Sequence, residues 1–277
     1  MEFILKTNII NGSIIFNIKN IKYNYIFMKK NLLYILLIFI NIMQINSGFL
    51  TYINTPPKKR IQIYKPDHYQ DKVNDNCIIF FSGGSNSISH RIYDDFLKKL
   101  QQQNISIYVP CFQYKHMDYL IRVLTRKYKN VIMMGHSSGC NTLLNHCNKK
   151  NIKNIILMDP VKTTIMKSCV FFLPFIKSVM FIQAMKSYKT SYKPFGLPFI
   201  PSFLRLQREN IQINDDSEVQ IVEYEQYGHS DILNPQISNF MHFSRITVGH
   251  ENRTLQHLYD YHTKVSILLN RFFIDNY

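Results

Sequence analysis

Short apolar runs alternate with helical patterns through the middle of the chain. The runs have the length and continuity of strands that are buried on both faces. They lie at 77–81, 105–109, 131–134 and 155–158. Apolar residues at helical spacing separate them, at 91–102, 117–128 and 140–148. Because parallel strands need crossover connections, this alternation predicts an α/β fold, with a mostly parallel sheet and helices on both faces.

The stretch 161–205 interrupts this rhythm. It contains a long apolar run at 169–181, then a run rich in proline and phenylalanine at 194–204, with a surplus of lysine. Its length and proline content predict a lid-like insertion over the sheet rather than another strand–helix unit. Regular patterning returns with alternating residues at 219–224, which indicate a strand, and with a helical pattern at 252–273.

An apolar run at 32–45 precedes the regular part of the chain, with two lysines before it and small polar residues after it. It is shorter than the ~20 residues of a membrane-spanning helix but fits the core of a signal peptide. Translation from Met28 gives the secretory order directly. If residues 1–27 are also translated, their lysines hold the N-terminus in the cytosol. Both versions predict a secretory route, to a secreted or membrane-anchored protein; a buried core helix is the alternative.

Composition predicts one globular domain after this leader. The chain has 277 residues, 46% hydrophobic and 14% aromatic, which excludes a disordered, collagen-like or disulfide-stapled chain. A proline-rich linker divides it into a leader segment, 1–55, and an α/β domain, 56–277. The five cysteines show no C-x-x-C pair and no zinc spacing, so we expect small buried side chains and no metal.

The net charge of +15 raises the question of a nucleic-acid partner. The charge is +6 over 1–76 (10 − 4), +7 over 77–160 (11 − 4), +7 over 161–210 (8 − 1) and −5 over 211–277 (4 − 9), so no single segment accounts for it. We find no recognition helix, zinc pattern or stacking platform and expect no nucleic-acid partner. The charge of 161–210, beside apolar residues, instead predicts an anionic membrane surface as a partner.

The sharpest motif is G-x-S-x-G at 135–139, between a predicted strand and a predicted helix. In this context the motif is a nucleophile elbow, in which the glycines relieve crowding around a strained turn that presents the serine hydroxyl. The motif makes Ser137 the candidate nucleophile. The alternatives are a phosphate-binding loop or a plain turn.

A serine nucleophile needs a base, and His229 is the candidate. It lies in the segment YGHSD at 227–231, directly after the predicted strand at 219–224. We expect His136, beside the nucleophile, to pack. The C-terminal histidines are expected in solvated or capping roles. They are His242, His250, His257 and His262.

The candidate acid is Asp159, which follows the predicted strand at 155–158. Its position gives the chain order Ser, Asp, His that this constellation requires. Three acidic residues nearer to the histidine strand remain as alternatives. They are Glu209, Asp215 and Asp216.

An acyl-transfer site also needs donors for an oxyanion. The loop FSGGSN at 81–86 follows the first predicted strand, and its glycine pair lets a backbone N–H face the site. The N–H groups of Gly84 and Ser138 are the predicted oxyanion hole.

These motifs resemble the α/β-hydrolase superfamily, and within it the chlorophyllase-like and platelet-activating-factor-acetylhydrolase-like serine esterases. The resemblance covers about 77–269 and is carried by SGGSNS, GHSSG, LMDPV and YGHSDIL. It implies an α/β-hydrolase fold with Ser137 as nucleophile, Asp159 as acid and His229 as base. The chain departs from the family at Ser82, where the family usually has histidine, and at Cys140, where it often has glycine.

The sequence therefore predicts a carboxylic-ester hydrolase, esterase-like or lipase-like, that acts through a Ser-His-Asp triad and an acyl-enzyme. The lid-like insertion favours a lipid or another apolar ester as substrate. No organic cofactor and no metal are implied. The alternatives are a catalytically silent binding protein on a hydrolase fold and an acyltransferase that uses the same triad.

Overall fold

The structure is a computed structural model, and the residues that it describes are 7–10, 13–16, 61–66, 75–86, 89–111, 114–162, 170–189, 191–192, 197–198, 205–243 and 254–276. The chain divides into two compact units, Met1–Leu50 and Thr51–Tyr277. In the first unit, strands β1 (Thr7–Ile10) and β2 (Ser13–Phe16) form an antiparallel pair. The predicted leader run at 32–45 lies outside the described residues. Among the helices that are described, none is both long enough and apolar enough to cross a membrane.

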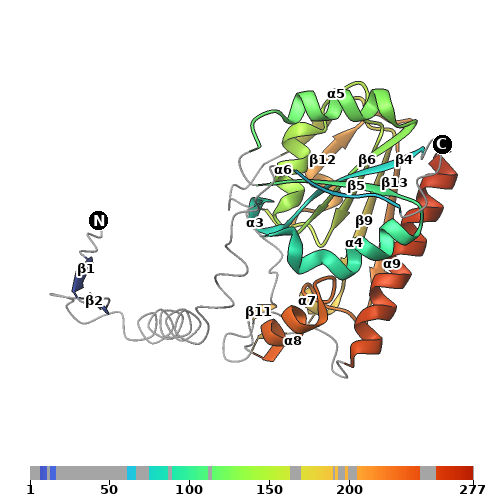
Figure 1. Cartoon of the computed structure of the whole chain (residues 1–277). Helices are drawn as coiled ribbons and strands as arrows, with labels where there is room; N and C mark the ends of the chain where they lie inside the picture. The colour runs from blue at the N-terminus through green and yellow to red at the C-terminus, as the bar shows by residue number, and fades with distance from the viewer. Residues whose placement is uncertain are drawn as a thin grey trace. The chain divides into compact units, whose positions relative to one another are not determined.

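The second unit is built on a seven-stranded sheet, with strand order β13-β9-β7-β6-β4-β5-β3 (Figure 1). In that order the strands are β13 (Glu218–Tyr224), β9 (Ser178–Ala184), β7 (Asn154–Met158), β6 (Asn130–His136), β4 (Asn76–Phe81), β5 (Ser106–Pro110) and β3 (Ile61–Tyr64). Neighbours pair in parallel, except that the edge strand β3 is antiparallel to β5. The four central apolar runs predicted as strands are all strands of this sheet.

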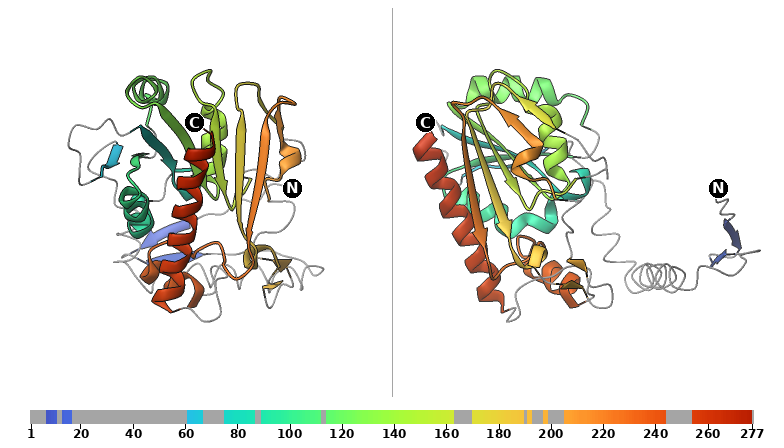
Figure 2. Two further views of the ribbon diagram at one scale, coloured as in Figure 1. Left: turned by 90° about the vertical axis from the view of Figure 1, so that its right-hand side faces the viewer. Right: turned by 180° about the vertical axis from the view of Figure 1, so that it is seen from behind.

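Helices cover both faces of the sheet (Figure 2). The helices that pack on it include α4 (Asp94–Gln102), α5 (Met117–Lys127), α6 (Gly139–His146) and α9 (Leu255–Asn276). A 3₁₀ turn, η1 (His90–Tyr93), leads into α4. Consecutive side chains of β4 point to opposite faces of the sheet and contact the helices on each face. Ile79 lies in the core cluster that includes the buried residues of α5 and α6. Phe80 packs against Phe96 of α4, whose ring also contacts His262 of α9.

Further elements connect this framework. They are α3 (Gly83–Asn86), β8 (Phe171–Leu173), α7 (Lys186–Lys189), β10 (Ser191–Tyr192), β11 (Leu197–Pro198), η3 (Arg208–Asn210), β12 (Ile211–Ile213) and α8 (Pro235–Phe243). Strands β8 and β12 pair in parallel outside the main sheet, and β10 pairs with β11. The turn α3 packs against α6, which places the end of β4 beside the turn that follows β6.

The prediction of an insertion over the sheet at 161–205 is wrong for Ser178–Ala184. This segment is the inner strand β9, paired in parallel with β7 on one side and β13 on the other. The physical reason is that its sequence, SVMFIQA, is apolar without a period that separates strand from buried helix. The prolines on either side of this segment favour irregular structure, so the sequence pattern predicts one irregular segment over the whole stretch. The parts at 163–169, 193–196 and 199–204 lie outside the described residues.

The fold is the α/β-hydrolase fold that the sequence predicts. Its sheet is parallel apart from one antiparallel edge strand, helices cover both faces, and the G-x-S-x-G segment joins the central strand β6 to α6. The carboxyl ends of the parallel strands therefore meet at one edge of the sheet. Every predicted site residue lies in a segment that follows one of these ends.

Candidate active site

Ser137 and Asp159 follow neighbouring strands at this edge. The register of β6 and β7 pairs His136 with Met158, so the next residue of each strand lies side by side with the other. The backbone N–H of Ser137 donates to the Met158 carbonyl at 2.9 Å, and the Val161 N–H donates to the Ser137 carbonyl at 3.3 Å. These two hydrogen bonds hold the serine turn against the segment that carries the aspartate.

Ser137 has a backbone φ of 57°, in the left-handed region that costs most residues energy and that is concentrated at functional sites. The flanking glycines make the turn sterically accessible. A Cβ on Gly135 would lie 2.9 Å from the Cα of Cys140, and one on Gly139 would lie 2.5 Å from the Phe81 carbonyl oxygen. The structure therefore supports the elbow geometry and explains both glycines by close backbone approach.

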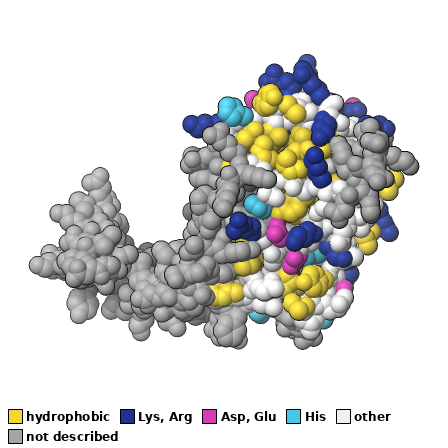
Figure 3. All heavy atoms as spheres, viewed as in Figure 1, with side chains coloured by type: hydrophobic (Ala, Val, Ile, Leu, Met, Phe, Trp, Pro, Cys, Tyr) yellow, Lys and Arg dark blue, Asp and Glu magenta, His cyan; other side chains and the backbone are white. Residues whose placement is uncertain are grey.

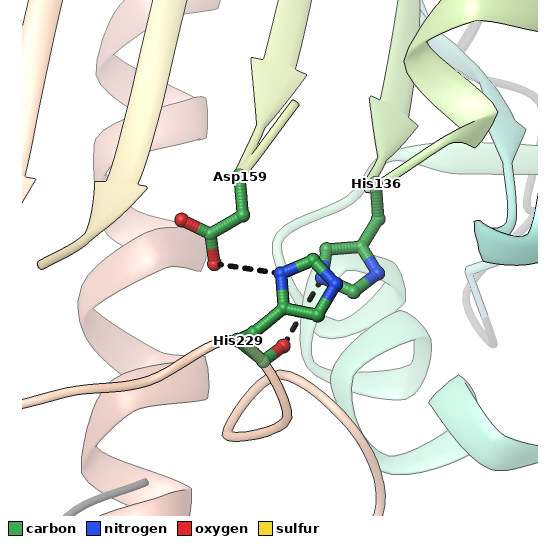
Figure 4. A group of neighbouring side chains, drawn as sticks. All are labelled: His136, Asp159 and His229. Atoms are coloured by element: carbon green, nitrogen blue, oxygen red, sulfur yellow. Dashed lines mark hydrogen bonds and ion pairs between the residues drawn. The ribbon is translucent and has the colours of Figure 1, made fainter. Parts of the chain in front are cut away.

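The carboxylate of Asp159 is buried and held from two sides. Its Oδ1 accepts the Ala184 N–H at 2.6 Å and the Tyr188 hydroxyl at 3.3 Å. Its Oδ2 faces Nδ1 of His229 at 3.7 Å (Figure 4). Because two donors fix one oxygen, the other is oriented toward the imidazole. Burial and the nearby carboxylate raise the pKa of Tyr188 well above its usual value, so this phenol stays a donor.

The loop that carries His229 is anchored by its own residues. The side chain of Asp231 is fully buried and accepts the Gly228 N–H at 2.8 Å and the Ser238 hydroxyl at 3.2 Å. The backbone N–H of His229 donates to Oγ of Ser187 in α7. His229 is only 9% exposed, so it is not an ordinary surface histidine.

The alternative acids lie elsewhere. Glu209, Asp215 and Asp216 are all exposed. Asp215 and Asp216 precede β13, so they are at the amino end of the strand, whereas His229 follows its carboxyl end. Of the four carboxylates considered, Asp159 is the one that the structure brings to His229.

His136 packs, as expected, but its neighbour is the candidate base. The two imidazole rings stack with centroids 4.6 Å apart and planes 28° apart (Figure 4). Nδ1 of His136 lies 2.9 Å from the Tyr93 hydroxyl, and Nε2 lies 3.2 Å from the His229 carbonyl oxygen. Burial lowers the pKa of His136 well below its usual value, so the ring is neutral. Its place beside the nucleophile was the only sequence signal for this contact.

The predicted oxyanion donors lie in two segments that touch. Gly84 is in the turn α3, with φ of 61°, and Ser138 precedes the first residue of α6. Gly139 brings the backbone of α6 against the carbonyl groups of Phe81 and Ser82, which lead into α3. The Gly83 N–H is already used, because it donates to the Tyr93 hydroxyl at 3.0 Å. The assignment of the hole to Gly84 and Ser138 stays a prediction.

The side chains of His136, Asp159 and His229 offer ligand atoms that lie within 4.8 Å of one another, a spacing that a metal ion could also use. The geometry of the rings does not favour one. Imidazole lone pairs lie in the ring plane, and two stacked rings do not aim them at a common point. Both nitrogens of His136 also have hydrogen-bonding neighbours. The arrangement suits proton transfer and orientation of a base.

Two further groups of predicted residues have mixed outcomes. The prediction of a solvated or capping role is wrong for His262, which is fully buried inside α9 and donates from Nε2 to the Asp231 carbonyl at 3.1 Å. His257 contacts Thr254 at the start of α9 at 2.8 Å, and His250 lies outside the described residues.

Among the described cysteines, three are buried free thiols and one is half-buried. They are Cys77, Cys140, Cys147 and, half-buried, Cys111.

Several solved structures are similar to this chain at low identity. The esterase domain of a Rhodothermus marinus protein shares 10% identity over 77% of this chain and 99% of its own, with a TM-score of 0.42. A sugar hydrolase from Lactococcus lactis shares 14% identity over 78% and 94%, with a TM-score of 0.48. Thermogutta terrifontis esterase 2, phosphoramylated by tabun, shares 12% identity over 78% and 88%, with a TM-score of 0.47. Similarity of this size carries no argument about activity.

No protein-family profile matches the chain, and no curated protein matches it either. The geometry of the site is therefore the basis for a function.

Proposed function

We propose that this protein is a serine hydrolase that cleaves carboxylic esters, with Ser137 as nucleophile, His229 as base and Asp159 as acid. One observation carries the proposal. A serine with φ of 57° follows the central strand, and the next strand is followed by an aspartate whose carboxylate lies 3.7 Å from a buried histidine. A strained serine beside an Asp–His pair is the arrangement that nucleophilic acyl transfer requires.

In the proposed reaction, Nε2 of His229 takes the proton from the Ser137 hydroxyl as the serine oxygen attacks the ester carbonyl carbon. The Asp159 carboxylate stabilises the imidazolium that forms. Backbone N–H groups of Gly84 and Ser138 donate to the oxyanion. The imidazolium then gives its proton to the departing alkoxide, which leaves as the alcohol. Water, deprotonated by His229, then attacks the acyl carbon of the acyl-enzyme. The bond to the Ser137 oxygen breaks, the acyl group leaves as the carboxylic acid, and the imidazolium returns its proton to the serine.

We propose a lipid or another apolar ester as the substrate class, for an enzyme of the chlorophyllase-like or platelet-activating-factor-acetylhydrolase-like kind. The support is the composition of the parts of 161–205 outside strand β9, which combine phenylalanine, leucine and isoleucine with lysine. Half-buried cations also flank the acid segment. Arg205 forms a backbone bridge with Val161, and its guanidinium donates to the Tyr188 carbonyl at 2.7 Å. Such cations suit an anionic lipid surface as partner, and the predicted leader suits a secretory route.

The test is covalent labelling with a fluorophosphonate probe, followed by turnover of an ester series with increasing acyl length. We expect the wild type to be labelled and Ser137→Ala to lose both labelling and turnover. The matched control is Ser217→Ala, which removes a serine hydroxyl that donates to the Ile176 carbonyl, before β13 and away from the site. A folded wild type that neither labels nor hydrolyses any ester of the series would overturn the proposal in favour of a catalytically silent hydrolase fold.

A further inference from the structure

A buried chain of hydrogen bonds connects the two loops that the proposed reaction needs. It begins at the Gly83 N–H, 3.0 Å from the Tyr93 hydroxyl oxygen. The same hydroxyl lies 2.9 Å from Nδ1 of His136, and Nε2 of His136 lies 3.2 Å from the carbonyl oxygen of His229. All four residues are buried. We call this set the Tyr93–His136 chain.

The two ends of the chain fix the direction of its first and last hydrogen bonds. A backbone N–H can only donate, and a backbone carbonyl can only accept. His136 therefore carries its proton on Nε2 and donates it to the His229 carbonyl. In neutral His136, Nδ1 accepts from the Tyr93 hydroxyl, whose oxygen accepts the Gly83 N–H. The doubly protonated ring, with Nδ1–H donating to the Tyr93 oxygen, is disfavoured because burial lowers the pKa of His136.

The charge state of His136 matters because its ring stacks on that of His229, with 4.6 Å between centroids. A second positive charge at this distance, in a buried site, would oppose the imidazolium that His229 becomes during the reaction. Burial keeps His136 neutral by lowering its pKa. Tyr93 also stays protonated, because burial raises the pKa of its phenol, so its hydroxyl can donate to Nδ1 of His136.

We propose that Tyr93 and His136 are positioning residues, which join the oxyanion loop at Gly83–Gly84 to the loop of His229 and so fix the catalytic imidazole relative to the oxyanion donors. This inference rests on the proposed function. Neither residue needs to touch the substrate. The contacts predict an effect on the chemical step rather than on binding, because misplacing a base by a fraction of an ångström slows proton transfer without removing any substrate contact.

The first test compares two buried Tyr→Phe variants. Tyr93→Phe removes the hydroxyl and retains the ring that packs on Phe80, with centroids 5.1 Å apart. We expect kcat to fall roughly tenfold or more, with KM within about twofold. Tyr128→Phe is the matched control, since it also removes a buried hydroxyl that is hydrogen-bonded at 2.9 Å, to Tyr108. Tyr128→Phe should lower the melting temperature about as much as Tyr93→Phe does and leave kcat unchanged.

The second test changes the histidine. His136→Gln retains an amide N–H that can reach the His229 carbonyl, whereas His136→Leu retains only bulk. We expect kcat of the glutamine variant to exceed that of the leucine variant by roughly tenfold. Equal kcat values for the two variants, or a wild-type kcat in Tyr93→Phe, would overturn the proposal.

The third test does not depend on activity. Nitrogen-15 NMR of the imidazoles should show His136 as the neutral Nε2–H tautomer between pH 5.5 and 8, and Tyr93→Phe should shift the His229 resonances while Tyr128→Phe leaves them in place. A His136 that titrates in this range, or His229 resonances unmoved by Tyr93→Phe, would overturn the chain. If the wild type is not labelled by fluorophosphonate, the proposed function fails, and these spectra still decide whether the chain holds the His229 loop.

Discussion

Backbone strain at the level of single residues is concentrated in the candidate site. Among the described non-glycine residues, positive φ occurs at Asn104, Ser137 and Asp159. Asparagine adopts this region readily, and Asn104 occupies the turn after α4. The other two are the proposed nucleophile and acid, on neighbouring strand ends. Strained residues persist where the surroundings over-determine them. Here the Ser137 backbone is hydrogen-bonded to Met158 and Val161, and the Asp159 N–H donates to the Ile182 carbonyl at 2.8 Å.

The strain at Ser137 predicts an inverted order of stability for two variants. At an ordinary helical position, alanine is more stable than glycine by about 1 kcal/mol. At φ of 57° the Cβ of alanine is disfavoured by about 1–2 kcal/mol, which glycine avoids. Urea unfolding should therefore show Ser137→Gly as at least as stable as Ser137→Ala. Lys98→Gly and Lys98→Ala, on the exposed side of α4, serve as the reference pair with the ordinary order. The usual order at both positions would contradict the strained turn.

The residues of the site differ in how far the sequence could predict them. Ser137 and His229 follow strands within short motifs, and Asp159 was favoured by chain order. Tyr93 and Tyr188 could not be found in this way, because each contacts the site through a side chain that crosses from a distant segment. A periodic pattern shows which face of an element is buried, but it does not show which buried hydroxyl meets which histidine.

At the level of elements, the elbow depends on how closely α6 approaches the end of β4. Gly139 lies against the carbonyl groups of Phe81 and Ser82, with no room for a Cβ. This contact places the start of α6, and with it the N–H groups of the turn, beside the loop that begins at Gly83. The helix N-terminus then points its partial positive charge toward the site.

Gly139→Ala should therefore disturb both stability and activity. Forcing a methyl group between two backbones typically costs about 1–3 kcal/mol of unfolding free energy. We expect a loss in this range by urea unfolding, together with a fall in kcat, because α6 and the oxyanion loop must separate. Asn145→Ala adds an alanine on the exposed side of the same helix and should change stability by less than about 0.5 kcal/mol. Wild-type stability and kcat in Gly139→Ala would show that the close approach is not required.

Elements with a clear period were predictable, and the exceptions have physical reasons. The alternation of β13 at the sheet edge predicts a strand. Strand β9 has no such signal, because both its faces are buried and its apolar run has no alternation. Its position between β7 and β13 depends on non-local pairing, which no local pattern encodes.

The described basic side chains include exposed lysines and arginines and buried histidines, beside the buried side chains of Asp159 and Asp231. Lysine and arginine side chains are spread over the face seen in Figure 3, in keeping with a net charge of +15 that no single segment supplies. Inside, His136 and His262 are buried, and burial lowers the pKa of each. They flank the His229 loop from two sides, through the carbonyl of His229 and that of Asp231. Low pH should therefore destabilise the His229 loop by protonating these two buried histidines.

Burial lowers the pKa of His262 from 6.5 to about 4. The unfolded chain binds the proton more readily, so the unfolding free energy is insensitive to this group above pH 6.5, falls as the pH drops from 6.5 to 4, and levels off below 4.

By this linkage His262 accounts for a loss of about 2 kcal/mol between pH 7.5 and pH 5. His262→Gln does not titrate and retains an amide N–H for the Asp231 carbonyl, so urea unfolding at the two pH values should show a loss smaller by about that amount. Ser266→Ala removes a buried hydroxyl from the same helix, one that donates to the Thr263 carbonyl, and should retain the wild-type pH dependence because it changes no titratable group. An unchanged pH dependence in His262→Gln would mean that His262 takes up its proton equally in the folded and unfolded states, against its complete burial between α4 and the His229 loop.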